Sequence, residues 1–216
     1  MIWSRCHMFG LDKEELKIIS RLNRPWRIQD YLSGLSQNHE VGGETCRSPR
    51  RVMRDRTAHC MEGAMFAGIV LWVHGAKPLL LDLKTGNSDD DHVVALFRMK
   101  SGRGAGSARS GAVSKTNHAV LRYRDPVYRD VRELAMSYFH EYFLDSGRKT
   151  LRSYSDPFDL SLIKDRSWIT SEKNLWQMPR ALDKSPHHPL LTAEQIKNLR
   201  RADMIERNAG KIAEWK

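Results

Sequence analysis

Residues 60–74 contain the longest apolar run of the chain and read Cys-Met-Glu-Gly-Ala-Met-Phe-Ala-Gly-Ile-Val-Leu-Trp-Val-His. Small and large apolar side chains fill nearly every face of this segment, which is typical of a helix buried at the centre of a fold. Gly75 predicts the end of the helix, because glycine readily adopts the left-handed conformation of a C-cap. The sequence therefore predicts a central buried helix that begins at Cys60.

Apolar segments after this helix predict a small sheet. Residues 78–84 (Pro-Leu-Leu-Leu-Asp-Leu-Lys) and 92–98 (His-Val-Val-Ala-Leu-Phe-Arg) read as two buried strands around an acidic turn. A third strand is expected at 111–117, and residues 120–123 are expected to extend the sheet. Residues 101–111 hold four glycines and no large apolar side chain, so a flexible loop is expected there.

Further helices flank the central one. Apolar spacing and prolines at helix starts predict three of them before Cys60, over residues 11–22, 26–35 and Pro49–Asp55. Another is expected to begin at Asp125, because Asp125-Pro126 combines an N-cap side chain with a proline at the first helical position. Asp145-Ser146-Gly147 is expected to end that helix.

The chain is expected to form one domain. An N-terminal helix occupies residues 1–24, and the core spans residues 25–147. The rest, residues 148–216, is expected to wrap the same domain as a tail with a helix near 193–200. Together these elements predict an α+β fold.

Composition narrows the class of protein. The chain has 216 residues and a net charge of +10, and 40% of its residues are hydrophobic. This composition excludes collagen-like, coiled-coil and fully disordered chains. The longest apolar run is far short of the ~20 residues that a membrane span needs, and no signal peptide is visible. We therefore expect a cytoplasmic protein that does not bind membranes.

The cysteines predict neither a disulfide framework nor a zinc site. Cys6, Cys46 and Cys60 cannot all pair, and the expected compartment is reducing. None of them belongs to a Cys-x-x-Cys motif. Cys46 lies in an Arg-rich connection and is interpreted as structural. No cofactor or metal is expected.

Cys60 is the candidate nucleophile. A thiol at a helix N-terminus feels the positive end of the helix dipole, which lowers its pKa, and the nearby Arg56 and His59 can add to this effect. The strand that begins at His92 can bring an imidazole to the thiol, where it takes the proton and later returns it to a leaving amine. Backbone N–H groups around Cys60 and Met61 can bind an oxyanion.

The third member of this site has two candidates. Asn117, at the end of the third strand, can hold the imidazole of His92 in the correct tautomer. Asp125 is the alternative, although its expected role as a helix N-cap already explains it, and we favour Asn117. His118 is the second choice for the imidazole itself. Residues 89–91 (Asp-Asp-Asp) offer oxygens to a hard cation, but an acidic turn between strands explains them equally well.

Two segments resemble the transglutaminase-like superfamily, whose fold is related to that of papain. Residues 56–67, followed by Gly75, resemble the helix that carries the family's nucleophilic Cys, and residues 91–97 resemble the strand that carries its His. Similarity to bacterial transglutaminase-like proteins extends over residues 25–143. The resemblance implies a papain/transglutaminase-like fold, in which a buried helix carrying the Cys packs on a small antiparallel sheet.

The resemblance also implies an activity. It predicts thiol-dependent acyl transfer or hydrolysis of a peptide or amide bond by Cys60, His92 and Asn117, with hydrolysis favoured. The chain departs from the family pattern at Gly111, where an aromatic residue is expected early in the third strand.

The positive charge suggests a function of another class. Five arginines precede Cys60, and a second basic group follows His92: Arg47, Arg50, Arg51, Arg54 and Arg56, then Arg98, Lys100, Arg103, Arg109 and Lys115. Such clusters can follow phosphates, although no nucleic-acid-binding motif accompanies them. The alternative function is therefore a catalytically inactive basic protein that binds an acidic protein or, less favoured, nucleic acid.

Overall fold

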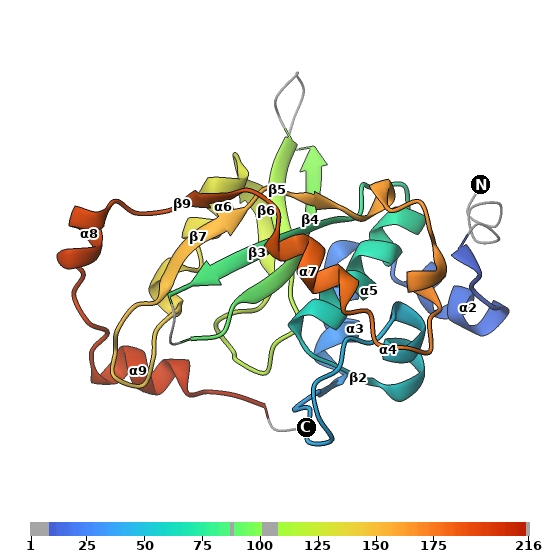
Figure 1. Cartoon of the computed structure of the whole chain (residues 1–216), viewed down its shortest axis with the longest axis horizontal. Coiled ribbons are helices and arrows are strands. Elements are labelled where there is room, and N and C mark those ends of the chain that lie inside the picture. Colours follow the sequence, from blue (N-terminus) through green and yellow to red (C-terminus); the bar gives the residue numbers. More distant parts are fainter. Residues whose placement is uncertain (1–8, 87–88, 101–107, 215–216) are drawn as a thin grey trace.

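The computed structural model describes residues 9–86, 89–100 and 108–214, and its centre is an antiparallel sheet (Figure 1). The strands lie in the order β6-β5-β4-β3-β7-β9, and β8 pairs with β3 off this path. Their bounds are Leu79–Thr85 (β3), His92–Lys100 (β4), Ala108–Val113 (β5), Arg124–Tyr128 (β6), Leu151–Ser155 (β7), Phe158–Asp159 (β8) and His187–Pro189 (β9). Helices complete a mixed α and β fold, as predicted.

The predicted central helix is α5, Cys60–Val73, and it packs against one face of the sheet. Its buried side chains share a core with Leu80 of β3 and with Val93 and Ala95 of β4. Since side chains alternate along a strand, the next residues of β4 face a second core. There Val94 and its neighbours pack beneath α6, Val131–Met136.

The three helices predicted before Cys60 are confirmed as α2 (Lys13–Arg21), α3 (Pro25–Ser33) and α4 (Pro49–Asp55). Asp12 caps α2 in a capping box, and Ser48 caps α4. Two short strands, β1 (Ser36–Gln37) and β2 (Thr57–Ala58), pair in parallel just before α5. This pairing brings residues 36–38 beside the chain that leads into Cys60.

The third predicted strand lies earlier than expected. It is β5, which ends at Val113, so Asn117 lies beyond the sheet. Residues 120–123 do not extend the sheet, and β6 follows them instead. At Gly111 a Cβ atom would lie 2.5 Å from the ring of Phe97 and 2.7 Å from the carbonyl oxygen of Arg124. No aromatic side chain fits at this position.

The prediction that a helix begins at Asp125 is wrong. Asp125 is exposed on the edge strand β6, and α6 begins after Asp130, whose carboxylate accepts from Glu133 N at 2.8 Å. A proline is tolerated on an edge strand because it need not donate to a neighbour. Asp125-Pro126 therefore suits a strand edge as well as a helix start.

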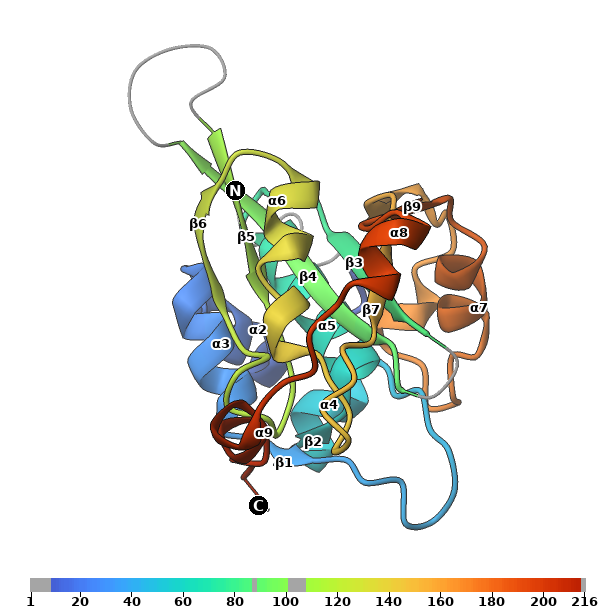
Figure 2. The ribbon, with the colours of Figure 1, turned by 90° about the vertical axis from the view of Figure 1, so that its left-hand side faces the viewer.

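The predicted tail does more than wrap the domain. It contributes β7, β8 and β9 to the sheet, which the sequence did not reveal because these strands are short and partly polar. Its α-helices are α7 (Gln177–Asp183), α8 (Ala193–Lys197) and α9 (Met204–Gly210). Short 3-10 helices lie at Phe139–Glu141, Leu160–Leu162 and Ser167–Ile169. Figure 2 shows the tail passing from α8 across the front of the molecule to α9.

Two predictions lie wholly or partly outside the described residues. Of the predicted loop 101–111, residues 101–107 are not described and the remainder belongs to β5. Cys6 also lies outside the described ranges. Within those ranges no helix has the length and apolar character needed to cross a membrane.

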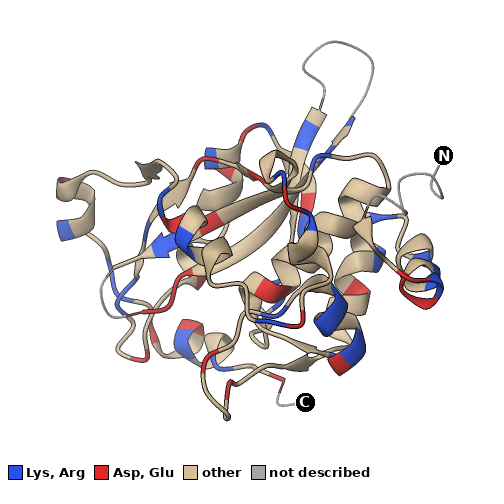
Figure 3. Cartoon of the chain, turned by 45° about the vertical axis from the view of Figure 1, so that its right-hand side comes forward, with Lys and Arg blue, Asp and Glu red and all other residues tan. Residues whose placement is uncertain are grey.

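Basic and acidic residues are interspersed over the fold (Figure 3). Arg50 lies 2.6 Å from Glu15, and Arg54 lies 2.7 Å from Glu172. Arg47 and Arg51 both lie within 4.0 Å of Asp55. Much of the first arginine cluster is therefore neutralised by carboxylates of the same chain.

Candidate active site

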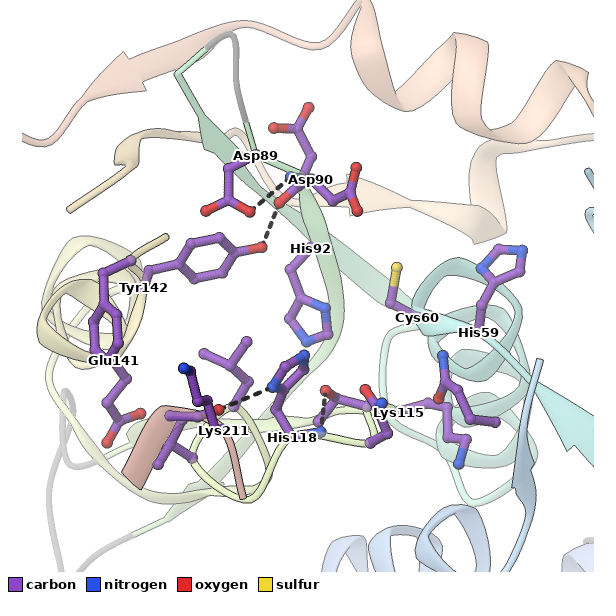
Figure 4. A pocket seen from close by; sticks show the side chains of 18 of the residues that line it. His59, Cys60, Asp89, Asp90, His92, Lys115, His118, Glu141, Tyr142 and Lys211 are labelled. Carbon is purple, nitrogen blue, oxygen red and sulfur yellow. Dashed lines mark hydrogen bonds between the residues drawn. The ribbon is translucent and has the colours of Figure 1, made fainter. Parts of the chain in front are cut away.

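A cleft of about 550 Å³ opens where the start of α5, the start of β4 and the segment after β5 meet. Cys60 is the first residue of α5 and is half-buried. His92 is the first residue of β4 and is 5% exposed. Figure 4 shows the Cys60 sulfur between two imidazoles, those of His59 and His92. The structure thus brings the two principal predicted residues into one cleft.

Ser114 holds the ring of His92. Its hydroxyl oxygen lies 2.7 Å from His92 Nε2, and the hydroxyl donates to the carbonyl of Leu121 at 2.8 Å. A hydroxyl has one proton to give, so it accepts from His92 and the imidazole proton lies on Nε2. Nδ1 of the neutral ring is then left as a base. The side chain of Gln29 fixes Ser114 further by bonding both its N–H and its carbonyl, at 2.9 and 2.8 Å.

His59 lies on the other side of the thiol and is the N-cap of α5. Its Nδ1 accepts from Met61 N at 3.3 Å, and its Nε2 lies 3.1 Å from the carbonyl oxygen of Thr45. Carboxylate oxygens of Glu62 and Glu40 lie 3.5 and 3.8 Å from the same Nε2. When His59 is neutral, Nδ1 caps the helix; when it is protonated, Nδ1–H is free to donate to the sulfur of Cys60.

The two imidazoles lower the pKa of the Cys60 thiol. Burial acts to raise the pKa of Cys60, but hydrogen bonding and charge from His59 and His92 outweigh it and lower this pKa to about 5. Burial acts to lower the pKa of His59, whereas Cys60, Glu62 and the Thr45 carbonyl raise it to about 9. The favoured state near neutral pH is therefore a Cys60 thiolate beside a His59 imidazolium.

Cys46 provides the contrast. It is buried, and burial together with the charge of Glu62 raises its pKa to about 12. The two thiols thus differ in reactivity because of their surroundings, since the thiolate is the nucleophilic form. The interpretation of Cys46 as structural agrees with this environment.

Glu62 supports the site from within the protein. Its side chain is fully buried and accepts hydrogen bonds from Asn38 Nδ2 (3.1 Å) and Thr45 Oγ1 (2.8 Å). It also accepts from the backbone N–H groups of Arg47 (2.8 Å) and His59 (3.0 Å). The carboxylate is therefore well solvated by protein dipoles, and it supplies negative charge beside the His59 ring.

Gln37 is a candidate oxyanion donor. The parallel pairing of β1 with β2 sets Gln37 opposite Ala58, two residues before Cys60, and its side chain lines the cleft. Its buried Oε1 has no hydrogen-bond partner within the described ranges. The N–H of Cys60 has no acceptor within its own helix, because it belongs to the first turn. The N–H of Cys60 is thus available to an oxygen bound beside the sulfur, and the Gln37 side chain, which can donate through Nε2, lines the same cleft.

The other predicted site residues lie in different places. Asn117 lines the cleft, but in the described structure it is Ser114, and not Asn117, that bonds His92 Nε2. Asp125 does not line the cleft. His118 lines it and is exposed, with Nδ1 3.2 Å from the carbonyl oxygen of Gly210. Arg56 is exposed and stacks 4.8 Å from the ring of Tyr31.

The acidic turn is held by local bonds. Asp89 accepts from Thr150 Oγ1 at 2.5 Å, and Asp91 accepts from Thr85 N at 2.7 Å. The carbonyl of Asp90 accepts from Tyr142 OH at 2.5 Å. Burial and the charges of Cys60 and the turn raise the pKa of Tyr142. This turn therefore forms a fixed acidic wall of the cleft.

Three carboxylates near this wall lie close enough together to suggest a metal site. Oxygens of Asp82, Asp91 and Asp183 lie within 4.8 Å of one another. However, Lys84 Nζ lies 3.2 Å from Asp91, 3.1 Å from Asp183 and 3.9 Å from Asp82. The donor set is already served by an ammonium, so it fits an ion-pair cluster better than a metal centre.

Comparison with models of known protein families and with curated proteins gives no match for this chain. The sequence had offered partial signals for the residues that surround the thiol. His59 adjoins Cys60, and Ser114 lies within the predicted third strand, 111–117. Gln37 and Asn38 carried no signal, because only the pairing of β1 with β2 brings them to the site.

Proposed function

We propose that this protein is a thiol-dependent hydrolase of peptide or amide bonds, with Cys60 as nucleophile. The observation that carries the proposal is the half-buried sulfur at a helix N-terminus, flanked by His59 and His92 in one cleft. A thiolate is both the attacking species and the form that this environment favours. A papain/transglutaminase-like fold is part of the proposal, supported by the buried Cys-bearing helix against an antiparallel sheet.

Acylation begins when the Cys60 thiolate adds to the substrate carbonyl carbon. The carbonyl oxygen becomes an oxyanion, which the N–H of Cys60 and the Gln37 amide stabilise. As the C–N bond breaks, the His59 imidazolium gives its Nδ1 proton to the leaving nitrogen. A neutral amine departs, and the acyl group remains on sulfur as a thioester.

Deacylation uses the other imidazole. Nδ1 of His92 takes a proton from water while the water oxygen adds to the thioester carbonyl. Collapse of this second intermediate expels the Cys60 thiolate and releases the carboxylic acid. The proton on His92 then returns to His59 through solvent, so that the resting state is restored. Ser114 keeps the Nδ1 lone pair of His92 available during this step.

The test is turnover of a peptide p-nitroanilide series by the full chain. The expected result is release of nitroaniline that is abolished in Cys60→Ala and retained in the matched control Cys46→Ala. Full turnover in Cys60→Ala would contradict the proposal. So would native Cys60 that resists iodoacetamide until the protein is unfolded.

A further inference from the structure

The cleft is walled on one side by a segment distant in sequence. We define the arm as residues 203–214, which comprise α9 and the chain after it. Arg207, Gly210 and Lys211 of the arm line the cleft together with His118. The arm therefore forms part of the wall of the cleft that contains Cys60.

The arm is bonded to the segment after β5 through an isolated β-bridge. Ala119 N donates to the carbonyl of Ile212 at 3.0 Å, and Glu214 N donates to the carbonyl of Asn117 at 2.9 Å. His118 and Ala213 form the antiparallel bridge between these two bonds. Residues 117–119 thus offer a backbone edge along the cleft, and an extended stretch of chain occupies it.

Little apolar burial holds the arm in place. Helices α8 and α9 have no buried residue, and Ile205 and Ile212 are 81% and 62% exposed. Besides the two backbone bonds, the arm is attached by the Gly210 carbonyl oxygen, 3.2 Å from His118 Nδ1, and by the ion pairs of Glu214 with Arg122 (3.0 Å) and of Lys211 with Asp145 (3.8 Å). Just before the arm, Ala202 N donates to the Gly147 carbonyl. Segments held by a few exposed backbone bonds open far more readily than the core does.

We propose that residues 117–119 form the edge along which an extended peptide substrate lies, and that residues 212–214 occupy this edge until a peptide displaces them. Main-chain bonds to a free edge are a general mode of peptide recognition, because they are available to any extended segment. The inference rests on the proposed function, since it assigns the substrate class of the same cleft. It also makes the arm an internal competitor for that substrate.

The test compares two full-length variants. Glu214→Pro removes the N–H that bonds Asn117, and Glu214→Ala removes the same side chain but keeps the N–H. The probe is a fluorescein-labelled peptide of residues 208–214 (Asn-Ala-Gly-Lys-Ile-Ala-Glu), whose binding is followed by polarisation. Loss of one backbone bond should raise the equilibrium constant for release of the arm about fivefold. The probe should therefore bind about fivefold more tightly to Glu214→Pro than to Glu214→Ala.

Hydrolysis is measured on the same two proteins. The expected result is a kcat/KM for peptide p-nitroanilides that rises in Glu214→Pro relative to Glu214→Ala, with competitive inhibition by the 208–214 peptide. Equal probe binding by both variants overturns the edge assignment, even if both hydrolyse peptides. Tighter probe binding by Glu214→Pro with no hydrolysis by either protein supports the edge assignment and overturns the proposed function.

Discussion

His92 Nε2 lies 2.7 Å from Ser114 Oγ, and this contact fixes which nitrogen of His92 can act as a base. The hydroxyl gives its proton to the Leu121 carbonyl, so it must accept from the ring. The role that a Cys-His-Asn set would give to an amide is therefore filled by a serine. The orienting group is an uncharged hydroxyl, and it sets the tautomer of the ring.

Replacing Ser114 by Ala should lower kcat by about tenfold or more while KM changes little, because general base catalysis contributes about 10²–10⁴. The ring loses its orienting acceptor, whereas the backbone bonds to Gln29 remain. Single-turnover kinetics on a peptide thioester checks the effect at deacylation. The matched control is Asn117→Ala. A larger loss in Asn117→Ala than in Ser114→Ala would return the orienting role to Asn117.

Alkylation of Cys60 should distinguish the role of His59 from that of His92. His59→Asn keeps an N-cap side chain but removes the imidazolium, so the pH midpoint of Cys60 labelling should rise from near 5 toward that of an ordinary thiol. His92→Gln should keep more of the low-pH labelling and lose turnover. Iodoacetamide rates read by peptide mass mapping measure both, with buried Cys46 as the internal unreactive thiol. An unchanged midpoint in His59→Asn would contradict the assigned ion pair.

Turnover should show a plateau bounded by the two shifted groups. Below pH 5 the Cys60 thiolate is protonated and activity falls; above pH 9 His59 loses the proton that the leaving nitrogen needs.

The stability of the fold should depend on pH through the same two groups. The lowered pKa of Cys60 stabilises the fold at high pH and this contribution is lost as pH falls through 5, while the raised pKa of His59 contributes at low pH and is lost through 9. Denaturant midpoints from pH 4 to 10, compared with those of Cys60→Ala, test both limits.

The fold was predictable where one pattern dominated. The apolar helix after Cys60 and the strand after His92 have strong local signals, and both occur within a few residues of the predicted bounds. The prediction of a helix at Asp125-Pro126 failed because the same dipeptide suits both a helix start and an edge strand. The His-His-Pro strand β9 could not be found locally, since its place depends on pairing with β7 across a long stretch of chain.

The candidate site was predictable only in part, for a related reason. Cys60 is the first residue of a strongly predicted helix, and His92 is the first residue of a strongly predicted strand. The order of these elements along the chain was enough to predict that the two side chains meet. Ser114, Gln37 and Glu62 depend on tertiary pairing. Glu62 in particular is a charged residue with no local signal for burial, yet it is fully buried among four donors.

Glu62→Ala should destabilise the protein strongly, by about 3–5 kcal/mol, because it leaves buried donors without their acceptor. The affected groups include the Asn38 amide and the N–H groups of Arg47 and His59. Glu62→Gln keeps the volume and one carbonyl oxygen, so its loss should be smaller. Urea unfolding measures both. Equal stability of wild type and Glu62→Ala would show that water replaces these bonds.

Gly63→Ala should disturb the site through packing alone. A Cβ at Gly63 would lie 2.3 Å from Cβ of Lys115, which is itself buried with Nζ bonded to the Leu35 carbonyl at 2.8 Å. Overpacking of this kind costs about 1–3 kcal/mol. The matched control is Gly42→Ala, where a Cβ would meet nothing within 4 Å. Because Lys115 follows Ser114 directly, displacement of Lys115 should also slow turnover in Gly63→Ala, whereas Gly42→Ala should retain both stability and rate. A Gly63→Ala protein with wild-type stability and turnover would contradict this packing argument.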